Sequence, residues 1–139
     1  MIVGLDLNLS DSRMTLQEIL KFLECSPKTF YLTGSRFFGN HTEHSDYDFF
    51  TQSNDFYVDF FLKIGFRKLT DVDFNEQTYD GKQFVTILEY LPLDGNKIQI
   101  QFVYEYDRKN RIQNRIKNEF KSFNDLTKEQ KRDLWSFLL

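Results

Sequence analysis

Two short groups of residues in the first third of the sequence have the types and the spacing to bind a metal ion and a phosphate. The first is Gly34-Ser35, and the second is the carboxylate pair Asp46 and Asp48, which follows after ten intervening residues. Alternate side chains leave a β-strand on the same face, so Asp46 and Asp48 project together. Because neighbouring carboxylates repel, this arrangement favours a cation between them. Mg²⁺ (or Mn²⁺) is the expected ion, since Mg²⁺ commonly binds one or two carboxylates together with phosphate oxygens and water.

The Gly34-Ser35 pair has the properties of a phosphate-binding corner. Gly34 lacks a Cβ, so its backbone can approach a ligand closely. Ser35 offers a hydroxyl and an N–H at the expected start of a short helix, where anions are stabilised. Arg36 follows directly and is a further nucleotide-binding candidate by position, although a surface ion pair would explain it equally well. A nucleoside triphosphate with its metal ion would bridge the corner and the carboxylates.

The order of these features resembles the DNA polymerase β-type nucleotidyltransferases, particularly the minimal members that are little more than a catalytic core. The shared pattern is a β-like segment, Gly-Ser, ten residues, and Asp-x-Asp on a second β-like segment. The resemblance implies an α/β (α+β) fold in which helices flank a mixed sheet. It implies catalytic and metal-binding roles for Asp46 and Asp48, with the nucleotide on Gly34 and Ser35. The implied reaction transfers a nucleoside monophosphate from a nucleoside triphosphate to a hydroxyl of a protein, an RNA or a small molecule.

The resemblance also implies a third acidic residue on a later strand beside the Asp-x-Asp strand, and here the sequence departs from the pattern. The strand expected at that place, KIQIQFVY, presents Gln99 and Gln101. The third acid usually helps to bind the metal and to receive the proton of the attacking hydroxyl. Loss of a general base lowers a rate by ~10²–10⁴, and a neutral amide is a poor ligand for a hard dication.

Three interpretations of this departure are open. Glu89, on the neighbouring strand of a predicted hairpin, could supply the carboxylate, so the third ligand would be Glu89, Gln99 or Gln101. Alternatively, Asp46 and Asp48 suffice for slow transfer with water as the proton acceptor. In the third interpretation the protein is catalytically impaired and binds nucleotide or a protein partner. The resemblance suggests a HEPN-type ribonuclease toxin as that partner, because minimal transferases of this kind pair with such toxins.

Apolar periodicity and turn signals predict the elements that must position these residues. A capping box at Thr15 and Glu18 and a helical apolar spacing predict a helix over residues 15–24. β-like runs predict strands at 30–33 and 45–51, with a short helix at 35–38 between them. The other expected elements are a helix from 53 or 54 to 63, a strand at 66–70, a loop at 71–81, hairpin strands at 82–91 and 97–104, and helices at 108–121 and from 127 onwards.

Composition limits the class of protein. The chain has 139 residues, of which 40% are hydrophobic and 28% charged, so we expect one globular domain spanning residues 1–139. A net charge of −3 gives no general attraction to nucleic acid, so an RNA acceptor would need a local basic patch. The basic helix at 108–121 could provide one, although a solvated helix face is the simpler interpretation. With one cysteine, no basic leader and no apolar run near ~20 residues, we expect a cytoplasmic protein outside the membrane.

Overall fold

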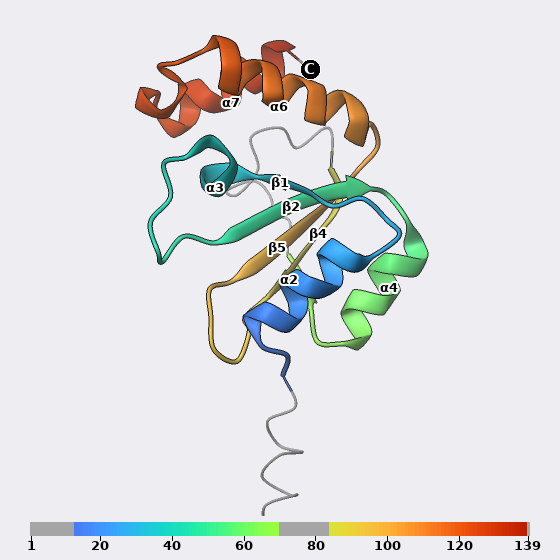
Figure 1. Ribbon diagram of the computed structural model, residues 1–139. Coiled ribbons are helices and arrows are strands. Elements are labelled where there is room, and N and C mark those ends of the chain that lie inside the picture. The colour runs from blue at the N-terminus through green and yellow to red at the C-terminus, as the bar shows by residue number, and fades with distance from the viewer. Residues whose placement is uncertain (1–12, 70–83, 139) are drawn as a thin grey trace, which may run out of the picture.

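In the computed structural model, which describes residues 13–69 and 84–138, helices lie on both sides of a five-stranded mixed sheet (Figure 1). The helices are α2 (Leu16–Cys25), α3 (Gly34–Phe38), α4 (Asp55–Lys63), α6 (Tyr106–Glu119) and α7 (Lys128–Leu138), with a 3₁₀ turn η1 (Phe123–Asp125). The strands are β1 (Tyr31–Thr33), β2 (Tyr47–Gln52), β3 (Arg67–Lys68), β4 (Phe84–Tyr90) and β5 (Ile98–Val103). The predicted fold class, a mixed sheet flanked by helices with two C-terminal helices, is confirmed.

The strand order is β1-β2-β5-β4-β3, and β2 and β5 are the parallel neighbours. The other neighbours are antiparallel, including the predicted hairpin of β4 and β5. All six residues of β5 are buried, because this central strand is covered on both faces. The predicted loop at 71–81 lies outside the described residues.

Capping boxes begin two helices at the predicted places. At α2, the Thr15 hydroxyl accepts a hydrogen bond from the Glu18 N–H, and the Glu18 carboxylate accepts one from the Thr15 N–H. At α7, Thr127 and Gln130 make the same reciprocal pair, with distances of 3.1 and 2.9 Å. These bonds satisfy N–H groups that the first turn of a helix leaves without partners.

One face of the sheet is apolar and is covered by α2 and α4 (Figure 1). Its centre is Phe61 of α4, which is fully buried and contacts the rings of Phe22, Phe66 and Phe102. Fully burying a side chain of this size stabilises the fold by about 1.5–3 kcal/mol. This face is therefore the main hydrophobic core.

The opposite face lies under α6 and α7 and is divided into an apolar and a polar part. The apolar part is a cluster of Phe50, Leu69, Ile87 and Val103. The C-terminal helices are held to β1 and α3 by side-chain hydrogen bonds to backbone. Gln113 of α6 donates to the Leu32 carbonyl at 2.9 Å, and Asn124 of η1 donates to the Phe38 carbonyl at 2.9 Å.

No helix within residues 13–69 and 84–138 has both the length and the apolar character needed to cross a bilayer.

Candidate functional site

The corner between β1 and α3 lies directly against Asp48. In the antiparallel pairing of β1 and β2, Thr33 is the register partner of Asp48, and Gly34 is the next residue. Gly34 has φ +69°, and a Cβ placed there would collide with the Asp48 carboxylate and lie 3.1 Å from its Cγ. Both the backbone conformation and the space therefore require glycine here. The structure thus brings together the two groups of residues that the sequence pointed to.

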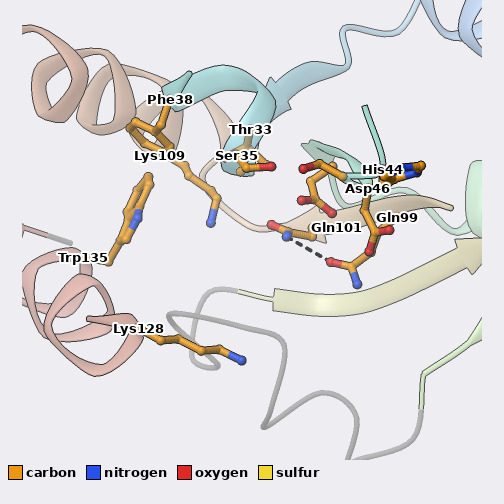
Figure 2. A pocket seen from close by; sticks show the side chains of 13 residues that line it. Thr33, Ser35, Phe38, His44, Asp46, Gln99, Gln101, Lys109, Lys128 and Trp135 are labelled. Carbon is orange, nitrogen blue, oxygen red and sulfur yellow. Dashed lines mark hydrogen bonds between the residues drawn. The ribbon is translucent and has the colours of Figure 1, made fainter. Parts of the chain in front are cut away.

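A cavity of about 560 Å³ opens over this corner (Figure 2). This volume is in the range of small-molecule sites. Its floor comes from β2 and β5, one wall from the β1–α3 corner with Ser35, and another from α6 and α7. The polar side chains on its floor and far wall are Asp46, Asp48, Gln99, Gln101, Lys109 and Lys128.

The surroundings of Asp48 shift the pKa of its carboxyl group strongly. Burial, and then the charge of Asp46, raise the pKa of Asp48 from 3.8 to about 7, while Lys97 and Arg36 act in the opposite direction. Within the described residues, neither Asp46 nor Asp48 is in an ion pair with a side chain. A carboxylate whose pKa is raised by burial and by a neighbouring negative charge is a favourable place for a cation.

The donor set at this point fits Mg²⁺. Asp46 and Asp48 offer hard carboxylate oxygens, and the cavity leaves room for phosphate oxygens and water, the ligands with which Mg²⁺ completes its octahedron. The described residues contain no group of three or more His, Cys, Asp or Glu side chains placed to hold a metal ion. Among the described residues, Asp46 and Asp48 are therefore the carboxylates that could bind a metal ion at this site.

Arg36 has a different place from the one expected for a nucleotide-binding residue. Its guanidinium donates to the backbone carbonyls of Ser45, at 3.1 Å, and Thr42, at 3.4 Å, and lies 3.8 Å from the centre of the Tyr47 ring. It does not line the cavity. Arg36 therefore braces the loop that leads into Asp46, and it acts on the site through its charge near Asp48.

Amides stand where a third acid was expected. Gln99 is the register partner of Asp48, and Gln101 is the partner of Phe50. Both glutamines line the cavity and are buried, and Gln101 Nε2 donates to Gln99 Oε1 at 3.4 Å. The sheet position beside Asp48 is thus occupied by a neutral side chain that cannot accept a proton.

Glu89 does not fill this gap. It lies across β5 as the register partner of Gln99, but its carboxylate is paired with Arg67 and with Lys97, at 3.5 Å in the second case. It does not line the cavity that contains Asp46 and Asp48. The structure therefore gives no support to the interpretation in which Glu89 supplies the missing carboxylate.

The sequence pointed to the basic helix at 108–121 as a possible binding surface, but it did not single out Lys109 or Trp135. Lys109 of α6 is only 5% exposed, and its ammonium lies 4.9 Å from the centre of the Trp135 ring. Trp135 of α7 is 2% exposed and lines the same cavity. A signal for Lys109 does exist, because it stands three residues before Ile112 and seven before Ile116 and so belongs to the buried stripe of its helix. A lysine within such a stripe indicates that the surface against which the stripe packs is polar.

Comparisons of this chain with protein-family models, with curated proteins and with solved structures find no match. The chemistry of the site is therefore inferred from its own residues.

Proposed function

We propose that this protein is a nucleotidyltransferase of the DNA polymerase β type, which binds a nucleoside triphosphate with Mg²⁺ and transfers the nucleoside monophosphate to a hydroxyl group. One observation carries the proposal: the glycine–serine corner packs against Asp48, with Asp46 beside it, at the wall of a nucleotide-sized cavity. Two carboxylates held close to a corner that offers a serine hydroxyl suit a metal-bound triphosphate.

Each residue has a simple role in this proposal. Gly34 leaves room for the Asp48 carboxylate against the corner, and the Ser35 hydroxyl donates to a phosphate oxygen. Asp46 and Asp48 hold the metal ion, which when bound would neutralise phosphate charge and polarise the reacting phosphoryl group. Arg36 keeps the loop before Asp46 in place through its bonds to Ser45 and Thr42.

The proposed transfer needs no reagent besides the nucleoside triphosphate, the acceptor and water. The acceptor hydroxyl oxygen forms a bond to the α-phosphorus, the bond from that phosphorus to the bridging oxygen breaks, and pyrophosphate leaves. The hydroxyl proton passes to water, because Gln99 and Gln101 cannot take it. We therefore expect transfer ~10²–10⁴ slower than with a positioned general base.

The test is incubation of the protein with each α-labelled nucleoside triphosphate and Mg²⁺, followed by measurement of pyrophosphate and labelled product. We expect Asp46→Asn and Asp48→Asn to abolish both signals. Asp59→Asn, on the exposed side of α4, is the matched control and should leave them unchanged. Equal product from the wild type and the Asp46→Asn/Asp48→Asn double variant would rule out this catalytic assignment.

A second function, a catalytically impaired protein that binds nucleotide or a protein partner such as a HEPN-like toxin, is favoured by one specific observation. The sheet position beside Asp48 holds Gln99, and Glu89 is engaged by Arg67 and Lys97. In this case Mg²⁺ with a nucleoside triphosphate raises the melting temperature, since a ligand at 100 times its Kd adds about 2.7 kcal/mol, but no pyrophosphate forms. A melting shift without turnover therefore selects binding over transfer.

A further inference from the structure

Lys97 is a cation on the strand that runs beside the acid pair. It immediately precedes β5, and its backbone carbonyl accepts a hydrogen bond from the Tyr47 N–H at 2.9 Å. Its side chain leaves the sheet on the same face as that of Gln99, the register partner of Asp48, because alternate residues of a strand share a face. The Lys97 side chain is 35% exposed, so its charge is open to solvent and to ions. A positive charge is therefore held close to the carboxylates.

The ion pairs of Lys97 do not cancel its charge. Its Nζ lies 3.5 Å from Glu89 Oε2, and the other oxygen of this carboxylate is paired with Arg67. One negative charge is thus shared between two cations. Because a charge acts over several ångströms whether or not it is also part of an ion pair, Lys97 still acts on the groups around it.

The charges that act on Asp48 are of both signs. Burial and then Asp46 raise the pKa of Asp48, whereas Lys97 and, to a smaller extent, Arg36 lower it. The two acids and the two cations leave little net charge at the acid pair. A free divalent cation is therefore attracted by the carboxylates and repelled by Lys97 and Arg36.

A divalent cation that arrives with a triphosphate experiences these charges differently. The triphosphate carries more negative charge than the cation neutralises, so the complex as a whole is an anion. The carboxylates bind its metal ion, while Lys97 attracts its phosphates through the electrostatic field. The complex thus gains from both signs of charge, and the free cation gains from one.

We propose that Lys97 is a specificity-determining residue whose charge makes the acid pair bind a divalent cation as its triphosphate complex in preference to the free cation. This inference rests on the proposed function, because it concerns the form in which the substrate and its metal ion are bound. Lys97 acts through its field and needs no direct contact with the phosphates, in agreement with its position outside the lining of the cavity. The metal ion and the triphosphate then enter the site together.

Two ligands test this role. One is Mn²⁺ alone, followed by the paramagnetic relaxation of water protons, and the other is the preformed complex of Mn²⁺ with inorganic triphosphate, followed by calorimetry. Titration at pH 8, above the pKa of Asp48 of about 7, keeps competition from protons small. We expect Lys97→Met to bind Mn²⁺ alone about 5-fold more tightly than the wild type and the complex about 5-fold more weakly. Both differences should shrink in 1 M salt, where the screening length is about 3 Å.

Further variants serve as controls and as an opposite test. Lys97→Arg keeps the charge and should bind both ligands as the wild type does. Glu89→Gln removes the negative charge beside Lys97, so it should weaken binding of Mn²⁺ alone and tighten binding of the complex. Lys21→Met, at an exposed position of α2 on the other face of the sheet, is the matched control and should change neither affinity. Thermal unfolding checks that each variant is folded, and Glu89→Gln carries the test if Lys97→Met is not.

The opposite signs of the two changes separate this role from a structural one, because a structural defect would weaken both ligands. The inference is overturned if Lys97→Met changes both affinities in the same direction or leaves both unchanged, or if the wild type binds Mn²⁺ alone more tightly than the complex. The proposed function would survive each of these results, provided that the wild type still transfers labelled nucleotide and Asp46→Asn/Asp48→Asn does not. Absence of both nucleotide binding and transfer in the wild type would instead remove the proposed function, and this inference with it.

Discussion

The two faces of the sheet use the same strands for different purposes. Toward α2 and α4, buried residues such as Phe61, Ile100 and Phe102 make an unbroken apolar core. Toward α6 and α7, the same strands hold the half-buried Asp48 and the buried Gln99 beside apolar neighbours. The first face supplies stability, and it allows the second face to hold buried polar groups that would otherwise favour unfolding.

The largest expected effect is on the apolar face. Phe61→Ala removes a fully buried ring that contacts five others, and we expect the free energy of unfolding to fall by about 3–5 kcal/mol. Urea denaturation measures this change in the free energy of unfolding. Phe56→Ala, on the same helix but 72% exposed, is the control and should change the free energy of unfolding by less than about 1 kcal/mol. Similar losses from both variants would contradict the assignment of this face as the core.

The next prediction separates backbone strain from contact with the site. Gly34→Ala and Gly39→Ala both introduce a Cβ at positive φ, +69° and +89°, so both should lose about 1 kcal/mol of stability. Only the Cβ at position 34 meets Asp48, whereas nothing lies within 4 Å at position 39. We therefore expect Gly34→Ala alone to weaken binding of Mg²⁺ and triphosphate, by at least about 10-fold (1.4 kcal/mol), as titration calorimetry would measure. Equal weakening by the two variants would show that the contact between position 34 and Asp48 does not affect binding of Mg²⁺ and triphosphate.

The raised pKa of Asp48 predicts how stability depends on pH in the absence of metal. Between 3.8 and about 7, the folded protein holds a proton that the unfolded chain releases, so the free energy of unfolding falls as pH rises through this window. Asp48→Asn removes this dependence and should raise the free energy of unfolding at pH 8 by about 1–3 kcal/mol, with no gain at pH 3. Denaturation at both pH values, with Asp59→Asn as control, measures the effect. An equal gain in the free energy of unfolding at pH 3 would show that titration of Asp48 is not the cause of the gain.

The smallest expected effect comes from restoring a third carboxylate. Gln99→Glu places an acid beside Asp48 and should tighten Mn²⁺ binding about 10-fold, which corresponds to about 1.4 kcal/mol. It should also lower stability without metal, because it adds a buried negative charge beside the half-buried Asp46 and Asp48. Mn²⁺ titration followed by paramagnetic relaxation measures the affinity. Unchanged Mn²⁺ affinity in a folded variant would mean that the cation does not lie between Asp48 and position 99.

Local elements could be predicted well because their signals are short-range. The capping boxes at Thr15 and Thr127 begin helices where expected, and the hairpin of β4 and β5 follows from alternation and a turn. Boundaries shifted where distant contacts decide them, and α6 begins at Tyr106, two residues before the predicted start. The predicted strand at 66–70 is a two-residue β3, because its pairing depends on β4.

The sequence by itself determined the acid pair, the glycine–serine corner and the succession of helices and strands, since each depends on residues close together in the chain. Only the tertiary structure decided what surrounds Asp48. The strand register places Gln99 beside Asp48, and the Glu89 carboxylate forms ion pairs with Arg67 and Lys97. Helix packing brought Lys109 and Trp135 into the same cavity from the C-terminal third. These placements follow from burial on both faces of the sheet, which is a property of contacts between distant segments.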